Sequence, residues 1–139
     1  MKAVLLDTHV LVWLLEGSER LKATSRSVIQ KASNNDALFV SAITPWEIAM
    51  LVRKDRLVLN REVKEWLQTA LALPGICLHP LSVEIAVAST CLPGNLHLDP
   101  ADRIIVATAR HLGATLVTAD RCLLDFGTLG HLKCLAASS

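Results

Sequence analysis

Short runs made mostly of apolar residues alternate along this chain with longer segments in which apolar residues recur every three or four positions. Such runs are typical of strands buried on both faces, and they lie at residues 2–6, 37–42, 76–78, 115–118 and, as a short edge strand, 131–135. The helical spacing predicts helices at residues 9–15, 19–32, 45–54 and 100–112, the last of which ends at Gly113. Asn60 and Ser82 are expected to cap two more helices, and residues 136–139 to form a tail.

Strands that alternate with helices predict an α/β fold in which right-handed crossovers join parallel strands. We therefore expect a three-layer α/β/α architecture with a central parallel sheet of four to five strands. The 139 residues fit one domain that can bury a substantial core, and a hydrophobic content of 52% argues against disorder. A single domain over residues 1–139 is the resulting expectation.

Composition bears on cellular location, on the state of the cysteines and on nucleic-acid binding. Charged residues interrupt every apolar run before it reaches the length of a membrane span, and the first residues lack a signal-peptide core and cleavage site. A cytoplasmic protein with no membrane association is expected. The four cysteines show neither a C-x-x-C pair nor zinc spacing, which favours reduced thiols. Because the net charge is only +1, any nucleic-acid binding must come from local patches.

Four carboxylates occupy comparable places at the junctions between predicted elements. Asp7 and Asp120 follow apolar runs, whereas Glu47 and Asp102 lie three residues after predicted helix caps. In an open parallel sheet such positions converge at the carboxyl ends of the strands, where ligands bind. The four acids are therefore expected to form one cluster.

A local explanation competes with this one for two of the acids. The segments Thr44-Pro45-Trp46-Glu47 and Asp99-Pro100-Ala101-Asp102 share the order cap, proline, any residue, acid. Proline is favoured at the first helical position, and an acid three residues after the cap completes a capping box. Taken singly, Glu47 and Asp102 are explained more simply by capping than by catalysis.

Taken together, the four acids favour a metal site. Two carboxylates about 5 Å apart repel by about 3 kcal/mol at an effective dielectric near 20. Such a cluster either holds protons at neutral pH or binds a cation, and all-oxygen ligands suit Mg²⁺ or Mn²⁺ better than zinc. The chemistry that fits is hydrolysis of phosphodiester bonds by metal-activated water.

Four segments, in order, resemble the motifs of PIN-domain nucleases, and most of all the VapC toxin branch. They are residues 7–13, 41–49, 99–109 and 116–120, and the resemblance extends from residue 2 to about residue 135. It implies a Mg²⁺- or Mn²⁺-dependent endoribonuclease of PIN fold that cleaves RNA. It also implies a homodimer and a VapB-type antitoxin encoded beside the toxin.

The resemblance assigns roles to the acids position by position. Asp7 and Asp102 match the principal metal ligands of the family, and Glu47 matches an acid that acts directly or through water. Asp120 matches a fourth, more variable acid that helps to hold a second ion or an ordered water. Asp99 is interpreted as the helix cap, with a ligand role left open. The pair His97-Leu98 departs from the family, which often has a basic residue just before this Asp-Pro.

Several other residues are candidates for contacts with the substrate or the acids. Thr8 and Thr118 match polar family positions that can hydrogen-bond the acids or their waters. Arg103 is a candidate for a phosphate contact or for orienting an acid, and Trp46 is a candidate for stacking in the substrate groove. Other cationic and aromatic side chains have simpler interpretations: a solvated helix end for Arg53, Lys54 and Arg56, the rim of the site for His9, and the core or a dimer interface for Trp13 and Trp66.

Two alternatives to a toxin nuclease remain. A phosphatase of the haloacid-dehalogenase type also begins with a strand that ends in Asp, but it needs Asp-x-Asp where this chain has Asp7-Thr8-His9. A catalytically silent PIN-like protein that binds RNA or acts as a scaffold usually lacks some of the acids, and here all four are present.

Overall fold

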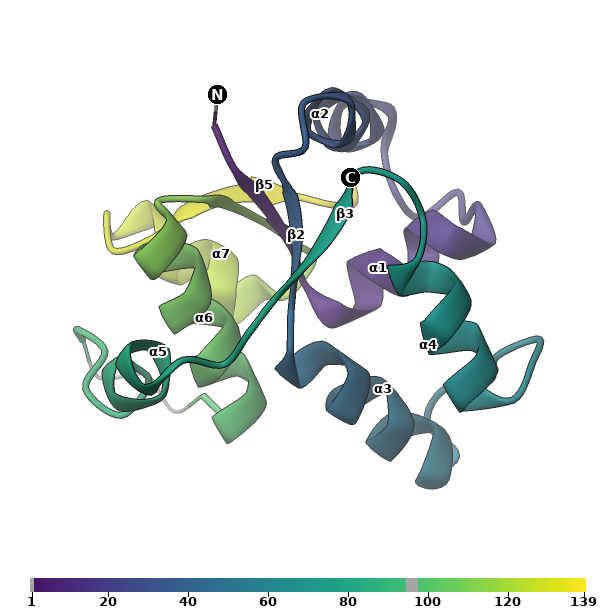
Figure 1. Cartoon of the computed structure of the whole chain (residues 1–139). Helices are drawn as coiled ribbons and strands as arrows, with labels where there is room; N and C mark the ends of the chain where they lie inside the picture. Colours follow the sequence, from purple (N-terminus) through teal and green to yellow (C-terminus); the bar gives the residue numbers. More distant parts are fainter. Residues whose placement is uncertain (1, 95–97) are drawn as a thin grey trace.

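The computed structural model describes residues 2–94 and 98–139, and it has a five-stranded, wholly parallel sheet at its centre (Figure 1). The strands are β1 (Val4–Leu6), β2 (Leu38–Ser41), β3 (Ile76–His79), β4 (Thr115–Thr118) and β5 (Lys133–Ala136). Their order across the sheet is β3-β2-β1-β4-β5. The predicted α/β fold with a parallel sheet is thus confirmed, with five strands.

Strand β1 lies in the middle because it is apolar on both faces. Leu5 and Leu6 are both fully buried, and they face opposite sides of the sheet. From β1 the chain proceeds to β2 and β3 on one side, then returns to place β4 against the other side of β1. The strand order therefore reverses between β1 and β4, and in such sheets the ligand crevice lies at the carboxyl ends of the two strands.

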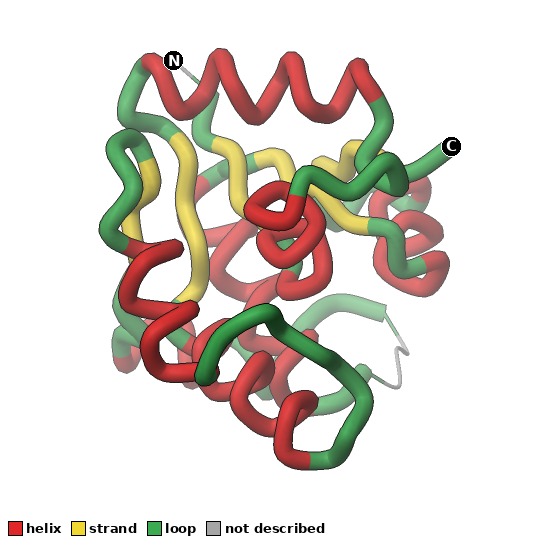
Figure 2. Tube along the Cα trace, turned by 90° about the vertical axis from the view of Figure 1, so that its right-hand side faces the viewer, coloured by secondary structure: helices red, strands yellow, loops and turns green. Residues whose placement is uncertain are grey.

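Helices cover both faces of the sheet. They are α1 (Thr8–Glu16), α2 (Ala23–Asn34), α3 (Ile43–Arg53), α4 (Val63–Leu71), α5 (Val83–Ala88), α6 (Pro100–Leu112) and α7 (Arg121–Thr128). Figure 1 shows α1, α3 and α4 to one side of the strands and α5, α6 and α7 to the other, and in Figure 2 α2 extends lengthwise above them. No helix in the described ranges is both long enough and apolar enough to cross a bilayer.

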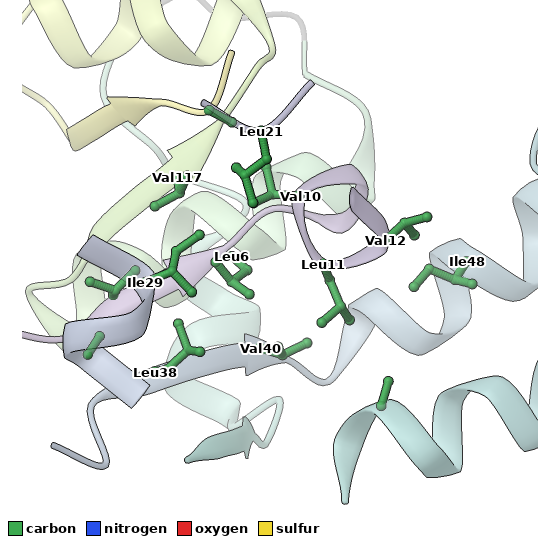
Figure 3. Close-up of a cluster of buried hydrophobic side chains, with 14 of the residues drawn as sticks. Leu6, Val10, Leu11, Val12, Leu21, Ile29, Leu38, Val40, Ile48 and Val117 are labelled. Carbon is green, nitrogen blue, oxygen red and sulfur yellow. The ribbon is translucent and has the colours of Figure 1, made fainter. Parts of the chain in front are cut away.

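Two apolar cores fill the space between the layers. The larger one joins Leu6 and Val40 of the sheet to Leu11 of α1, Ile29 of α2 and Ile48 of α3, as Figure 3 shows. The smaller one packs buried residues of α6 and α7 against the opposite face of the sheet. Since α1 and α3 are both packed into the larger core, the acids near their amino ends are held on rigid elements.

The largest differences from the predicted element boundaries are in α2, α4 and α5. Helix α2 begins at Ala23 and not at residue 19, and helix α5 ends at Ala88, whereas the sequence predicts that it continues to about Cys91. Helix α4 begins at Val63 after Glu62, whose carboxylate accepts a hydrogen bond from the backbone N–H of Lys64, so the prediction that Asn60 caps this helix is wrong. Ser82, by contrast, caps α5 as predicted, and its hydroxyl accepts from the Ile85 N–H at 3.2 Å.

The carboxyl-terminal region is more ordered than the sequence predicted. Helix α7 was not predicted, and Ala136 belongs to β5 rather than to a tail. Ala137 is fully buried, and its backbone N–H donates to the Thr118 carbonyl at 2.9 Å. The hydroxyl of Ser25 on α2 donates to the Ala136 carbonyl at 2.7 Å. These bonds attach the end of the chain to the core.

Candidate metal centre

The four acids predicted from the sequence meet around one open cleft of about 500 Å³ at the carboxyl edge of the sheet. Asp7 follows β1 and caps α1, and Asp120 follows β4 and caps α7. Glu47 lies near the start of α3, and Asp102 lies in the first turn of α6. The cleft therefore occupies the place where the strand order reverses.

Asp7 forms the buried floor of the cleft. Its Oδ1 accepts a hydrogen bond from the Thr8 N–H at 2.9 Å, and its Oδ2 accepts one from the Thr118 hydroxyl at 2.6 Å. Burial raises the pKa of this carboxyl above its ordinary value, although both hydrogen bonds act in the opposite direction. The carboxyl is thus fixed in position, in buried surroundings that disfavour its charged form.

Glu47 is held by a hydroxyl and not by its own helix end. Thr8 Oγ1 donates a hydrogen bond to Glu47 Oε1, and Thr44 Oγ1 lies 3.5 Å from Thr8 Oγ1. Burial raises the pKa of Glu47, and the nearby charge of Asp7 adds to this effect. Thr8 therefore connects the acid of α3 to the start of α1.

The predicted capping box at Thr44 is wrong. Helix α3 begins at Ile43, one residue before Thr44, and Thr44 is fully buried inside it. The hydroxyl of Ser41 accepts from the Ile43 N–H at 3.2 Å and satisfies one of the free donors at this helix start. A capping box therefore does not account for the acid at position 47, and the structural explanation that competed with a functional one does not apply to Glu47.

Asp99 and Asp102 extend the cluster to α6. Asp99 is the helix cap, as predicted, and its Oδ1 accepts from the Asp102 N–H at 2.9 Å. Burial, followed by the negative charges of the neighbouring acids, raises the pKa of Asp102 to about 8. Carboxylate oxygens of Glu47, Asp99 and Asp102 all lie within 4.8 Å of one another. This spacing suits a shared cation, because hard divalent ions prefer several oxygen ligands.

Asp120 lies at the exposed side of the cleft. Its Oδ1 accepts from the N–H groups of Cys122 and Leu123 at 2.8 and 3.3 Å, and its own N–H donates to the Thr118 hydroxyl at 3.0 Å. Thr118 thus contacts both Asp7 and Asp120. Because Asp120 is exposed and its Oδ1 caps α7, we consider this residue a weaker candidate ligand than the buried Asp7.

The two remaining predicted contact residues lie next to the acids in sequence. The Arg103 side chain donates from Nε to the Leu98 carbonyl at 3.1 Å. Trp46 is 54% exposed and is not among the described residues that line the cleft. Their roles toward substrate stay predictions, and His97 lies outside the described residues.

Three residues line the cleft although the sequence did not predict them there. Trp13, Arg20 and Arg56 all line the acidic cleft. His9 and Trp13 are four residues apart on α1, a spacing that places them on one helix face and that could have indicated Trp13. Arg20 and Arg56 follow the ends of α1 and α3, where no sequence pattern indicates which way a loop side chain points.

Comparison with known proteins identifies this arrangement. The family model of the PIN domain matches residues 4–128. The chain belongs to the PIN-domain family. A PIN-domain relative, Ribonuclease VapC22 of Mycobacterium tuberculosis (strain ATCC 25618 / H37Rv), is 38% identical over 123 residues, which cover 88% of this chain and 91% of the relative. The predicted membership of the VapC branch is thereby confirmed.

Solved structures of other proteins share the fold. VapBC2 from Rickettsia felis, bound to a DNA fragment from its promoter, aligns with a TM-score of 0.70 at 17% identity and covers 96% of this chain and 98% of its own. DNA-bound VapBC from Salmonella typhimurium aligns with a TM-score of 0.66 at 15% identity and covers 98% of both chains. FitAcB from Neisseria gonorrhoeae has a TM-score of 0.63 at 22% identity over 95% of this chain and 96% of its own. At these identities the likeness establishes the fold.

Proposed function

We propose that this PIN-domain protein is a metal-dependent endoribonuclease of the VapC type, the toxin of a toxin–antitoxin pair. The proposal is carried by the convergence of Asp7, Glu47, Asp102 and Asp120 on one cleft. It is supported by the 38% identity to a VapC ribonuclease. The active site is the carboxyl edge of the sheet between β1 and β4.

The acids suit a hard divalent cation. Every candidate ligand atom is a carboxylate oxygen, and burial, to which the charges of the neighbouring acids add, raises the pKa values of Asp7, Glu47 and Asp102. A cation would stabilise the charged form of these carboxylates. Asp7 and Asp102 would be the principal ligands of Mg²⁺ or Mn²⁺, with Glu47 beside them. Asp99 would contribute its second oxygen, and Asp120 would help to hold a further ion or an ordered water. A bound ion of this kind supplies activation of water and neutralisation of charge on phosphorus.

The side chains around the acids keep them in place. Thr118 holds Oδ2 of Asp7, and Thr8 holds Oε1 of Glu47, so neither carboxylate must be ordered when an ion binds. Positions fixed in advance lower the entropic cost of assembling a site. We assign Thr8 and Thr118 to positioning the acids, and Arg103 and Trp46 to the edge of the substrate path beside them.

The proposed partners are RNA, an antitoxin and a second copy of the chain. The solved neighbours described above include VapBC assemblies, which supports an antitoxin that binds this chain and inhibits it. For the second copy we propose the face of α5, where Val83 and Val87 lie one helical turn apart and are 81% and 60% exposed. Light scattering of wild type and a Val83→Ser/Val87→Ser variant tests this, since the variant is expected to be monomeric.

The decisive experiment combines cleavage and metal binding. Purified wild-type protein with Mn²⁺ should cleave single-stranded RNA and arrest growth of its host, whereas Asp7→Asn and Asp102→Asn should do neither while their melting temperatures show a folded protein. Asp125→Asn is the matched control, because Asp125 is an exposed acid outside the cleft. If wild type binds Mn²⁺ without cleaving RNA, the protein is the silent PIN-like alternative. An open reading frame for a small protein beside this one would support the toxin assignment.

A further inference from the structure

The acidic cleft is chemically divided along its length. Helices α1 and α3 both begin at the carboxyl edge of the sheet, pack against each other and extend away from it (Figure 1). Asp7 and Glu47 lie at their amino ends. At a rise of about 1.5 Å per residue, Trp13 lies about 8 Å farther along α1, and Arg20 and Arg56 follow the last turns of the two helices. One end of the cleft is therefore acidic and the other carries arginines.

Arg20 is held in position at its end of the cleft. Its Cζ lies 4.6 Å from the centroid of the Trp13 ring, which is the geometry of a cation–π contact. The loop that carries Arg20 is itself braced, because the Arg26 side chain donates to the carbonyls of Ser18 and Leu21. Less side-chain entropy is then lost when Arg20 binds a ligand. The guanidinium of Arg20 is thus preorganised for binding an anion.

The chemistry of this end fits a polyanion that approaches the acids. A strand of RNA places one phosphate at the acidic end for cleavage, and its neighbouring phosphates need positive partners because the acids repel them. Arginine suits this task because its planar fork binds phosphate oxygens in pairs. Arg53 and Lys54 are exposed on the same helix end as Arg56, but they do not line the cleft. The structure thus separates Arg56 from the solvated cations with which the sequence grouped it.

We propose that the RNA strand extends from the acids along the groove between α1 and α3, where Arg20 and Arg56 bind the backbone phosphates next to the cleavage point. Trp13 is a positioning residue that holds Arg20 over this path. This inference rests on the proposed ribonuclease function and adds a direction for the substrate. It places the flanking nucleotides on the side of α1 and α3, away from α5 and α7.

Binding of RNA without cleavage tests the proposal. In an Asp7→Asn background with Mg²⁺, fluorescence anisotropy measures the Kd of a labelled, mixed-sequence single-stranded RNA at several salt concentrations. Arg20→Gln and Arg56→Gln should each weaken binding by about three- to ten-fold and lower the slope of log K against log salt by about 0.7 to 1. Arg53→Gln is the matched control, because it removes the same charge from the same helix end outside the cleft.

The role of Trp13 has its own test. Trp13→Leu should weaken RNA binding about as much as Arg20→Gln, the double variant should be no weaker than either single one, and Trp13→Phe should retain part of the affinity because it keeps an aromatic face. Additive losses at Trp13 and Arg20 would overturn the positioning role. Melting temperatures show whether any variant is unfolded. If Trp13→Leu does not fold, Trp13→Phe alone and combined with Arg20→Gln tests the positioning role.

The outcome also separates this inference from the proposed function. If wild type cleaves RNA and Asp7→Asn does not, while Arg56→Gln and Arg20→Gln bind RNA like Arg53→Gln, the path is wrong and the ribonuclease function stands. If the arginine variants lose RNA affinity but wild type with Mn²⁺ never cleaves, the function is wrong and the path describes an RNA-binding surface.

Discussion

Thr118 Oγ1 donates a hydrogen bond of 2.6 Å to Oδ2 of Asp7. The two residues directly follow Leu6 and Val117, the last residue pair that joins the parallel strands β1 and β4. The bond joins positions 111 residues apart in the chain. Since the same hydroxyl accepts the Asp120 N–H, one threonine sets the relation between two acids of the proposed active site.

Removing this hydroxyl should impair activity more at low pH than at high pH. The Thr118 bond lowers the pKa of Asp7 against the stronger effect of burial, so Thr118→Val should raise that pKa further. Loss of a hydrogen bond to a charged group is worth about 1.5–3 kcal/mol, and we expect about ten-fold or more slower cleavage near pH 6 with a smaller defect near pH 8. Rates measured across pH check this. Thr108→Val, which removes a buried hydroxyl bonded to the Ile104 carbonyl, should leave the pH profile unchanged.

The metal-free protein should become less stable as the pH rises from about 4 to about 8. Asp102 has a pKa of about 8 in the folded state against 3.8 as its ordinary value, so the folded state keeps a proton that the unfolded chain releases. Stability from this group is complete below pH 3.8 and is lost as the pH rises through 8. Calorimetry in EDTA should show a falling melting temperature in wild type and a flatter profile in Asp102→Asn. Identical profiles in the two proteins would contradict the assignment.

Metal binding should oppose this loss most strongly at high pH. The ligands must be deprotonated, so Mn²⁺ binding releases protons. The rise in melting temperature on adding Mn²⁺ is expected to be larger at pH 8 than at pH 6. A rise of equal size at both values would show that the acids with raised pKa do not bind the ion.

Asp99 can be tested for a role beyond capping, because asparagine caps a helix as well as aspartate does. Asp99→Asn keeps an oxygen for the Asp102 N–H but removes the charge, so the melting temperature should change little. If the second oxygen binds the ion with Glu47 and Asp102, Mn²⁺ affinity measured by calorimetric titration should fall about ten-fold. Asp99→Ser, a second cap without a carboxylate, should behave alike. Unchanged affinity in both variants would leave Asp99 as a cap alone.

Gly75 should be the glycine least tolerant of alanine. Its φ is +86°, and an added Cβ would lie 2.7 Å from the Ser33 carbonyl oxygen at the end of α2. Gly130 has the same φ with open space around it, so Gly130→Ala should cost only the backbone penalty of about 1–2 kcal/mol. Gly75→Ala should cost about 1–3 kcal/mol more because of the clash. Urea unfolding of both variants checks the difference, and equal midpoints would contradict it.

Much of the fold could be predicted because its signals are local. Apolar runs and glycine stops placed the five strands and six of the helices to within a few residues, and the acids were located by their positions at element ends. Helix α7 was missed because its eight residues form a helix through burial of Leu123 and Phe126, together with capping by Asp120. Burial of these side chains depends on tertiary packing, and Gly127 lowers the helix propensity of so short a segment, so the sequence pattern did not predict a helix here.

Local sequence patterns were sufficient to place the acids after strands and at helix starts, because chain direction and apolar periodicity are properties of neighbouring residues. The packed structure was needed to show that Thr44 is a buried interior residue and not a cap, and that Thr8 holds Glu47. The packed structure also shows that Arg20 and Arg56 line the cleft with the acids, whereas Trp46 is not among the described lining residues. These contacts depend on how the helices pack and on the direction in which the loops extend from them. They join residues that are far apart in the sequence, so no local pattern predicts them.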